Sequence, residues 1–342
     1  MTEFYQKIQD LVKSQKTIMA TIVKAKDESH LGEKALFSEG EYLERTSHPV
    51  WDEIKEQLAN ITTPKLLTTT EVGVFAEVVS GTPKMIICGG GHISMPVSKI
   101  AKMLDFEVTV IDDRLAFAHA ERFPEADHVV CEDFSEALSK IPEDANNYFV
   151  IVTRGHKYDK LCLRQILEKS HAYIGMIGSK SRVRLVKEAM IEDGVSQELV
   201  DTVYTPIGLK IGAETPEEIA VAILGEIIQV KNTNAAGGGL NKDIMACILD
   251  ETKKEMPKAL VTIIARKGSA PRQAGTKMLV LPGGQCISTI GGGCVEAEVR
   301  RQAMLTLDDG KYRSLKVDMT GRNAEDDGMV CGGVVDVFIE LI

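Results

Sequence analysis

The sequence has no long apolar segment. No run of apolar residues reaches the roughly 18 that a membrane span requires, so we expect no transmembrane helix. Residues 1–16, MTEFYQKIQDLVKSQK, alternate charged and apolar side chains and lack the apolar core of a signal peptide. We therefore expect an amphipathic helix at this position, and a protein without a membrane partner.

Paired cysteines are also lacking. The chain has seven cysteines, an odd number, and none of them stands in a C-x-x-C pair. This pattern argues against a disulfide framework and against the clustered ligands of a structural zinc or iron–sulfur site. It is typical of free thiols in a reducing compartment, and we expect a cytoplasmic protein.

An excess of basic residues is missing as well. Lys and Arg number 40 against 50 Asp and Glu, which gives a formal net charge of -10 at pH 7. Nucleic-acid binding needs a basic face for phosphate contacts, so we expect no nucleic-acid partner. The 44% of hydrophobic and 26% of charged residues are ordinary for a globular protein, and 342 residues are enough for two or three domains.

The middle of the chain alternates strand and helix patterns. Short runs rich in Val and Ile predict strands at 85–88, 107–111, 148–153, 172–177 and 202–205. Helical patterns follow these runs, the last of them at 215–230. Strands that alternate with helices predict parallel pairing, so residues 82–231 should form a Rossmann-like α/β domain. A polar and glycine-rich stretch, residues 232–241, follows as a flexible linker.

The two outer segments resemble each other. Thr21-Ile22-Val23 aligns with Thr262-Ile263-Ile264, Lys34 with Lys277, and VGVFAEVV (72–79) with VDVFIELI (335–342). Helix, strands and ends occur in the same order, which favours an internal duplication. We predict that residues 1–81 and 242–342 form two related smaller α/β domains that flank the Rossmann-like one.

Only the second copy carries loops suited to chemistry. GSAPRQAG (268–275), TIGGGCVE (289–296) and DDGMVCGG (326–333) have no counterpart in the first copy. The first copy is therefore interpreted as degenerate, with a structural or interfacial role. The second is interpreted as the working copy.

A glycine motif, ICGGGHIS (87–94), follows the first strand of the middle segment. Glycines here permit a tight turn and let the backbone approach a diphosphate, while the next helix offers unpaired N–H groups. An acidic residue at the end of the second strand is placed to accept ribose hydroxyls. The fold can also be inherited without a nucleotide. The predicted cofactor-binding residues here are Gly89, Gly90, Gly91, His92 and Asp112.

Two further loops of the middle segment carry polar side chains. In TRGHKYDKLCL (153–163), side chains can contact phosphate, shuttle a proton, bind a metal or only anchor the loop by hydrogen bonds. In MIGSKSRVR (176–184), a hydroxyl and two cations at a helix start suit an anion, although a serine cap with solvated cations explains them equally well. The candidates are Arg154, His156 and Asp159 in the first loop, with Ser179, Lys180 and Arg182 in the second.

The last hundred residues supply the third group of candidates. TIGGGCVEAEVRRQAM predicts a strand, a glycine turn and a helix, so that Gly291, Gly292 and Gly293 would offer backbone N–H groups to an anion. Arg272 can add a bidentate contact to phosphate. A thiol at a helix start has its thiolate favoured, which applies to Cys294, and Cys331 lies between glycines in an acidic loop. Both cysteines can equally be small buried residues.

These motifs together resemble the XdhC/CoxI family. GSAPRxxGxxM, TIGGGxxE and CGGxVDVFIE are similar to its XdhC/CoxI domain, while ICGGGHIS, TRGHxxD, YIGMIGSKSR and PIGLKIGAETPEEIAVAILGEI are similar to its Rossmann domain. The resemblance covers residues 83–342. The family generally places the cysteine-bearing domain before the Rossmann domain, whereas here the intact copy follows it.

The resemblance implies an accessory protein for xanthine dehydrogenase-type molybdenum hydroxylases, a maturation factor more than a catalyst in the ordinary sense. It would bind the molybdenum cofactor (molybdopterin or its dinucleotide form), assist its sulfuration with a cysteine desulfurase, and insert it into the client enzyme. Cys331, with Cys294 as the second candidate, would handle sulfur or the metal of the cofactor, with no directly bound metal. Glu296 would bind a pterin nitrogen or only favour its helix dipole. We also expect a homodimer.

Three alternatives remain open. The Rossmann pattern also fits an oxidoreductase that uses NAD(P), in which His156 would serve as the proton donor. A nucleotidyltransferase-like enzyme would use the glycine loops with Asp112 or Asp113 and magnesium. A purely structural scaffold would bind no ligand at all.

Overall fold

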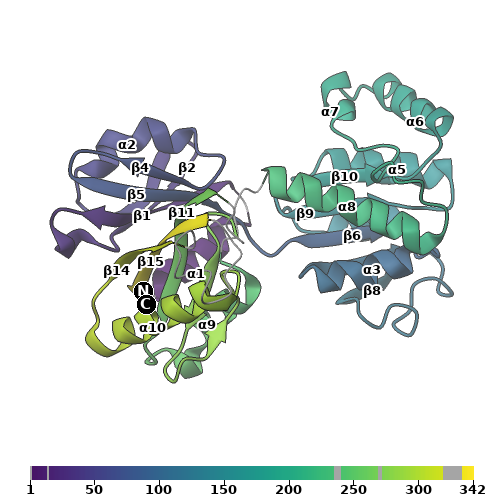
Figure 1. Cartoon of the computed structure of the whole chain (residues 1–342). Helices are drawn as coiled ribbons and strands as arrows, with labels where there is room; N and C mark the ends of the chain where they lie inside the picture. The colour runs from purple at the N-terminus through teal and green to yellow at the C-terminus, as the bar shows by residue number, and fades with distance from the viewer. Residues whose placement is uncertain (1, 14, 235–239, 269–271, 319–332) are drawn as a thin grey trace. The chain divides into compact units, whose positions relative to one another are not determined.

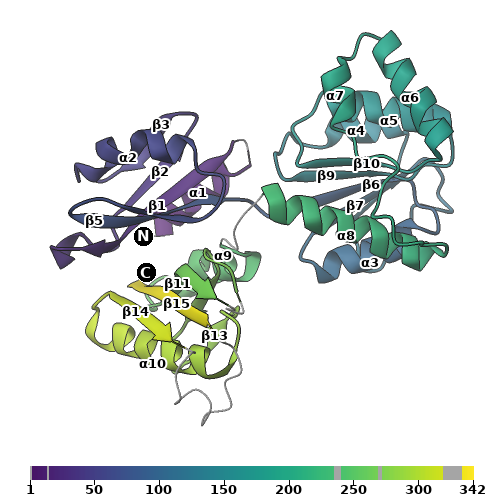
Figure 2. The same cartoon turned by 45° about the horizontal axis from the view of Figure 1, so that its top comes forward.

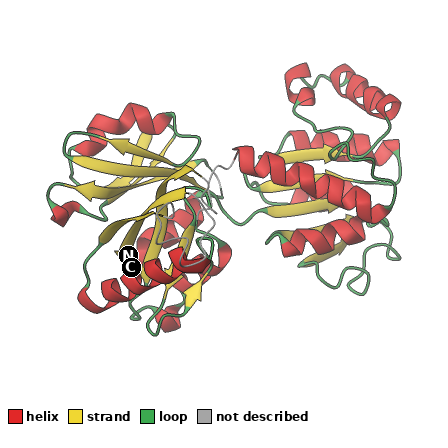
Figure 3. Ribbon diagram, in the orientation of Figure 1, coloured by secondary structure: helices red, strands yellow, loops and turns green. Residues whose placement is uncertain are grey.

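The computed structural model describes residues 2–13, 15–234, 240–268, 272–318 and 333–342, without the side chains of His156, Lys180, Asn234 and Cys294. Within these residues the strands form three five-stranded sheets, one parallel and two antiparallel (Figures 1 and 3). The chain divides into two compact units. Residues 1–80 and 234–342 form the first unit, and residues 81–233 form the second.

The first unit contains two sheets with the same strand order. The first sheet runs β3-β2-β1-β5-β4 and the second runs β13-β12-β11-β15-β14. The strands of the first are β1 (Thr17–Ala25), β2 (Lys34–Ser38), β3 (Glu41–Arg45), β4 (Lys65–Thr68) and β5 (Val72–Val79). Those of the second are β11 (Ala259–Gly268), β12 (Lys277–Val280), β13 (Cys286–Ile287), β14 (Arg313–Asp318) and β15 (Gly333–Leu341).

The helices of this unit cover both sheets. They are α1 (Thr2–Leu11), α2 (Val50–Ala59), α9 (Lys242–Leu249) and α10 (Gly293–Asp309), with 3-10 turns at Glu28–His30 and Glu251–Lys253. Helix α2 buries Trp51 and Ile54 on the outer face of the first sheet, and α10 packs in the same way on the second. Helices α1 and α9 share one apolar cluster with the inner faces of both sheets. The expected amphipathic helix near the start of the chain is therefore α1, which buries Tyr5 and Ile8.

The two sheets match in register as well as in order. Thr21 pairs with Lys34 and Phe75 in the first sheet, and Thr262 pairs with Lys277 and Phe338 in the second. Each central strand also has an irregularity at the same place, before Lys24 in β1 and before Ala265 in β11. These are the equivalences that the sequence alignment indicated.

Two buried ion pairs link the copies reciprocally. The ammonium of Lys34 lies 2.6 Å from a carboxylate oxygen of Glu340, and that of Lys277 lies 2.6 Å from Glu77. Their side chains are 5% or less exposed. Each lysine thus takes the glutamate of the other copy, so the first unit is built as an internal pseudo-twofold pair.

The second unit is a doubly wound α/β domain. Its sheet runs β10-β9-β6-β7-β8, with all neighbouring strands parallel (Figure 2). The strands are β6 (Lys84–Cys88), β7 (Glu107–Asp112), β8 (His128–Cys131), β9 (Asn147–Ile151) and β10 (Tyr173–Met176). The helices are α3 (Ser94–Met103), α4 (Phe134–Lys140), α5 (His156–Leu167), α6 (Lys180–Glu192), α7 (Gln197–Asp201) and α8 (Pro216–Asn234).

Alternate strand residues face two separate cores. Ile86 and Phe149 point to the side covered by α4, α5 and α6, whereas Met85 and Val150 point to the side covered by α3 and α8. Burial on both sides explains the unbroken apolar runs of these strands, which the sequence predicts as buried parallel strands. The predicted Rossmann-like sheet is confirmed.

Some predicted elements were wrong in detail. Residues 202–205 form no strand, only a single bridge between Tyr204 and Gly175. The strand expected before Gly291 ends at Ile287, and helix α8 continues into the first residues of the predicted linker. Strand β8 and helices α4 and α7 were not predicted, because each is short and only partly apolar.

Candidate functional site

The carboxyl edge of the parallel sheet brings together the loops after β6, β7 and β9. Counted along the second unit, the strand order is that of a Rossmann fold, and its direction reverses between β6 and β9. Gly89 follows β6 with φ of 113°, and a Cβ there would lie 2.5 Å from the carbonyl oxygen of Val152. The loops on either side of the switch point are therefore in direct contact, and only glycine fits the position.

Gly90 is held on both of its backbone groups. Its N–H donates to Asp112 Oδ2 at 2.8 Å, and its carbonyl oxygen accepts from Arg122 Nε at 3.0 Å. A Cβ on Gly90 would lie 2.1 Å from the carbonyl oxygen of Phe117. Gly91 differs, because a Cβ there would meet no described atom within 4 Å. In this turn Gly90 is fixed by hydrogen bonds, whereas Gly91 has free space beside its Cα. The next residue, His92, is exposed.

Asp112 lies inside the turn. Its side chain is 1% exposed, and its two oxygens also accept from Arg114 Nε at 2.8 Å and Arg114 Nη2 at 2.9 Å. Burial raises the pKa of Asp112, but the hydrogen bonds from Arg114 and Gly90 lower it further, so the net pKa is below its usual range. Asp112 therefore braces the glycine turn in this conformation. Its predicted contact with ribose stays a prediction.

We expect Asp112→Asn to destabilise the second unit by about 1–2 kcal/mol at neutral pH, because the charge-assisted bonds to Arg114 are lost. A carboxyl with a lowered folded pKa stabilises above its unfolded pKa of about 3.9 and loses that contribution as the pH falls through the folded pKa. The difference from wild type should therefore shrink below about pH 4. Denaturant unfolding at several pH values measures it, with the exposed Asp201→Asn as control. A difference independent of pH would contradict the assignment.

An ion pair joins the loops after β7 and β9. Arg154 Nη2 donates to Asp113 Oδ2 at 3.0 Å and to the Tyr158 hydroxyl at 2.8 Å. Arg154 is 41% exposed along its side chain and Asp113 is 21% exposed. The guanidinium of Arg114 lies 3.7 Å from the centre of the Phe117 ring, on the same loop as Asp113. Arginines thus line the glycine turn from both sides.

Asp159, Ser179 and Arg182 form a structural group behind this edge. Asp159 is fully buried and accepts hydrogen bonds from Thr153 Oγ1 at 2.5 Å and from Arg182. Ser179 accepts from the backbone N–H of Arg182 at 3.4 Å and caps α6. The structure therefore places Ser179 as a helix cap, and it pairs Arg182 with a buried carboxylate. His156 begins α5 and Lys180 begins α6, with side chains outside the described ones.

The second glycine turn precedes α10 in the first unit. Gly291, Gly292 and Gly293 have φ of 124°, 72° and 68°. Glu296 folds back onto the turn, where one of its oxygens accepts from the N–H groups of Ile290 at 3.2 Å and Gly292 at 3.1 Å. The same oxygen accepts from Thr289 Oγ1 at 2.5 Å. Glu296 thus occupies, as an anion, part of the N–H array that the sequence predicted for a ligand.

The remaining candidates of this unit are only partly described. Cys294 lies in the first turn of α10, and Arg272 is exposed beside residues that the structure does not describe. Cys331 itself lies outside the described residues. The proposed roles of both cysteines therefore stay predictions. Cys286, in β13, faces the Glu296 side of the turn, where burial and then the Glu296 charge raise the pKa of its thiol.

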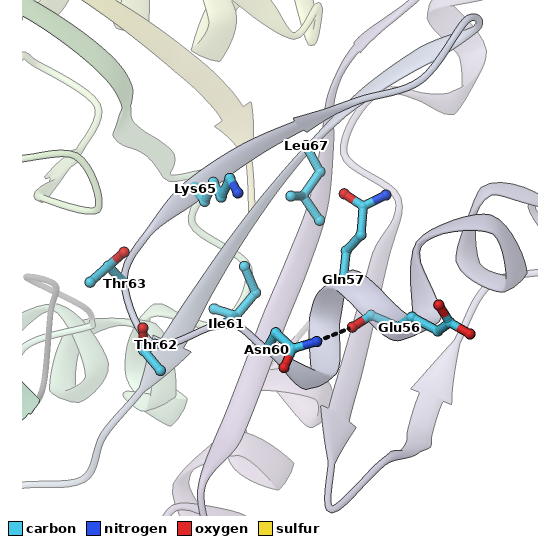
Figure 4. Close-up of a pocket in the computed structure, with 8 residues that line it drawn as sticks. All are labelled: Glu56, Gln57, Asn60, Ile61, Thr62, Thr63, Lys65 and Leu67. Carbon is cyan, nitrogen blue, oxygen red and sulfur yellow. Dashed lines mark hydrogen bonds between the residues drawn. The ribbon is translucent and has the colours of Figure 1, made fainter.

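Two surface hollows of the first unit have no predicted site residue in their lining. One of about 440 Å³ is lined by the end of α2 and the start of β4, including Gln57, Ile61 and Lys65 (Figure 4). The other, of about 360 Å³, lies between the β12–β13 turn and Arg300 of α10. Among the described residues, His, Cys, Asp and Glu side chains form no group of three or more that could hold a metal. None of the described helices is long and apolar enough to span a membrane.

Sequence reasoning named Asp113 only for the nucleotidyltransferase alternative, and it missed Arg114 and Arg122, which also lie beside the glycine turn. All three belong to the loop that follows β7 and wraps the glycine turn. The run IDDR contained a usable signal, because two carboxylates and an arginine follow the strand where only one acidic residue is usual. The sequence alone does not show which of the two carboxylates points inward, because this depends on strand β7 ending at Asp112.

Two family models match the chain. One, described as the XdhC Rossmann domain, matches residues 85–227, and the other, described as the XdhC and CoxI family, matches residues 252–318. The order of the two matches is the order that the motifs indicated.

Several known proteins are similar. An uncharacterized protein, YqeB, from Escherichia coli (strain K12) is 33% identical over 50% of this chain and 31% of its own length. A protein from Bacillus subtilis (strain 168), named as a probable xanthine dehydrogenase subunit, is 27% identical over 66% of this chain and 64% of its own. The chain thus spans less than two thirds of either relative. A crystal structure of a xanthine dehydrogenase from Bacillus halodurans is 20% identical, covering 68% of this chain and 94% of that one, with a TM-score of 0.42.

Proposed function

Because this chain belongs to the XdhC and CoxI family, we propose that it is an accessory protein that binds molybdenum cofactor and assists its sulfuration and insertion into a xanthine dehydrogenase-type molybdenum hydroxylase. The name of the Bacillus subtilis relative supports a partner of the xanthine dehydrogenase type. A cysteine desulfurase would be the second partner, as the source of sulfur.

The open glycine turn of the second unit is the observation that carries this proposal. Gly91 leaves space for a ligand next to its backbone, and Arg154 and Arg122 flank the turn with guanidinium groups. Arg122 Nη2 is buried and has no acceptor among the described residues. Unpaired buried donors are rare, so a phosphate oxygen of the ligand is a fitting partner. These residues fit the anionic end of a pterin cofactor.

The reactive end of the cofactor would be handled by Cys331, with Cys294 in support. The cofactor supplies molybdenum and its dithiolene as cargo, and the role of this chain is to hold the anionic end and to present a thiolate. Both roles fit a cofactor carrier without requiring turnover of a metabolite.

Cofactor loading tests this function. We expect the wild-type protein, purified without oxygen from a molybdenum-replete host, to carry molybdenum and pterin, and the Cys331→Ala protein to carry several-fold less. Cys131→Ala, which changes an exposed thiol of the second unit, is the matched control and should load like the wild type. Metal analysis and pterin fluorescence measure the loading. Equal and negligible loading in all three proteins would refute the proposal.

A second candidate is an oxidoreductase that uses NAD(P). The Rossmann strand order and the glycine turn at its switch point favour it. Nicotinamide dinucleotide retained by the purified protein, together with oxidation of NADH, would support this candidate over the first.

A homodimer is not needed to cover the first copy. The sheet of the degenerate copy needs a surface to cover its inner face, and the second copy covers it within the same chain. A dimer therefore stays a proposal, and sedimentation velocity measures the mass that decides it.

A further inference from the structure

The loop that carries Arg272 in the second copy rests on residues of the first copy. Gly275 ends this loop with φ of 90°, and a Cβ there would lie 3.0 Å from Pro64 Cγ and 3.4 Å from Glu77 Oε2. Both neighbours belong to the first copy, Pro64 just before β4 and Glu77 in β5. A side chain at position 275 would be strained by this φ and would push Pro64 away. Gly275 therefore allows the two copies to approach closely.

Backbone hydrogen bonds connect this contact to Arg272. The N–H of Gly275 donates to the carbonyl oxygen of Ile263 at 2.8 Å, which fixes the stem of the loop to β11. The N–H of Thr276 donates to the carbonyl oxygen of Gln273 at 3.3 Å and closes a turn directly after Arg272. The side chain of Arg272 is exposed. The backbone that carries this exposed guanidinium is thus held at its stem by β11 and by the first copy.

Two further contacts hold the same stem. Ala274 packs against a buried apolar cluster with two residues from each copy, namely Val23, Phe75, Ile264 and Phe338. Lys277, two residues after Gly275, forms its buried ion pair with Glu77 of the first copy. The stem of the loop therefore meets the first copy at more than one residue.

The pseudo-twofold arrangement repeats this contact on its other side. Gly32, the counterpart of Gly275, has φ of 81°, and a Cβ there would lie 2.1 Å from Tyr312 Cε2 of the second copy. Tyr312 and Pro64 are equivalent, because each directly precedes the strand that pairs with the last strand of its copy. The contact is therefore present twice, whereas only the loop of the second copy carries an arginine.

We propose that Pro64 is a positioning residue, which holds Arg272 through Gly275 so that the guanidinium meets an anionic group of the bound cofactor. A planar guanidinium makes a bidentate contact only in a fixed orientation, so the support of the loop stem determines how well it binds. The first copy would thereby take part in the site of the second, although it lacks the loops suited to chemistry. The inference rests on the proposed function, in which the anion is the molybdenum cofactor.

Pro64→Ala tests this role, because it removes the γ carbon that contacts Gly275 and leaves Arg272 in place. We expect this variant, purified without oxygen from a molybdenum-replete host, to carry about three- to tenfold less molybdenum and pterin than the wild type. Pro64→Val restores a γ carbon and should recover most of the loading. Metal analysis and pterin fluorescence measure it.

A double variant separates positioning from a general loss of stability. Arg272→Gln should lower the loading at least as much as Pro64→Ala does. The two substitutions together should carry no less cofactor than Arg272→Gln alone, because Pro64 acts only through Arg272. Losses that add would show that Pro64 has a merely structural role, and they would overturn the inference.

The matched control changes the equivalent contact on the other side. Tyr312→Leu removes the ring beside Gly32 and should load cofactor like the wild type, even where it lowers the free energy of unfolding more than Pro64→Ala does. Hydrogen exchange gives a readout that needs no cofactor. In Pro64→Ala, the amides of Gly275 and Thr276 should exchange about tenfold faster, while those of α10 keep the wild-type rate and report an intact fold.

The outcomes distinguish this inference from the proposed function. Wild-type loading by Pro64→Ala, or unchanged exchange at Gly275 and Thr276 in this variant, overturns the inference alone when the wild type carries cofactor. A wild type that carries no cofactor refutes the proposed function. In that case, faster exchange confined to Gly275 and Thr276 still supports the positioning of the loop by Pro64.

Discussion

Lys277→Met is expected to lower the free energy of unfolding of the first unit by about 3–5 kcal/mol, since it leaves the Glu77 carboxylate buried without its partner. Both side chains are 1% exposed, so water cannot replace the ammonium. The second carboxylate oxygen of Glu77 already has no hydrogen-bond donor among the described residues. Hydrogen exchange measured by mass spectrometry reports the loss, with the second unit as an internal reference.

The matched control removes both charges. Lys277→Met combined with Glu77→Leu should recover most of the lost stability, because a buried ion pair often contributes no more than apolar side chains of similar volume. Recovery would show that the pair specifies how the two copies meet and adds little net stability. If the double variant is as unstable as Lys277→Met, the pair itself stabilises the unit.

The pH dependence of the single variant has a definite sign. Burial raises the pKa of Glu77 even in the wild type, and the Lys277 ammonium opposes this only in part. Without Lys277 the pKa of Glu77 rises further. Protonation of the buried carboxyl then stabilises the fold at low pH, and this stabilisation is lost as the pH rises through the pKa of Glu77 in the folded protein. The defect of Lys277→Met should therefore deepen between about pH 4 and pH 7. A defect that is constant over this range would show that Glu77 is not the cause.

These ion pairs show which part of the fold could be predicted from the sequence. The alignment placed Lys34 on Lys277 and Glu77 on Glu340, and the strand registers agree with it. It could not show that each lysine takes the glutamate of the other copy, since apolar and charge patterns are local to one copy. The pairing is a property of two sheets packed face to face.

The candidate site divides in the same way. The glycine turn and the Rossmann-like sheet can be predicted from local sequence. Gly89 has a positive φ that favours glycine, and strands buried on both faces consist of unbroken apolar runs. The direction of each polar side chain is not. The Asp112 carboxylate accepts a hydrogen bond from the N–H of Gly90, and the Glu296 carboxylate accepts one from the N–H of Gly292. Backbone N–H groups need acceptors, and these two carboxylates are the acceptors nearest in space.

Substitutions at Gly90 and Gly91 separate effects on stability from effects on ligand binding. Gly90→Ala is expected to destabilise the second unit by about 3 kcal/mol, because its Cβ would lie 2.1 Å from a backbone oxygen of Phe117 that cannot rotate away. Gly90 lacks a positive φ, so contact alone causes the defect. The loop that carries Asp113 and Arg122 would have to shift, and nucleotide binding should fall with stability. Denaturant unfolding and titration with ADP measure both.

Gly91 is the matched position, one residue further along the same turn. A Cβ there meets no described atom within 4 Å, so Gly91→Ala should change stability by no more than about 0.5 kcal/mol. A larger side chain would fill the space in which a diphosphate approaches the backbone, so Gly91→Leu should leave the fold intact and weaken ADP binding by at least tenfold, an effect of about 1.4 kcal/mol. Unchanged binding by Gly91→Leu would move the ligand away from this turn. Equal destabilisation by Gly90→Ala and Gly91→Ala would contradict the contact that separates them.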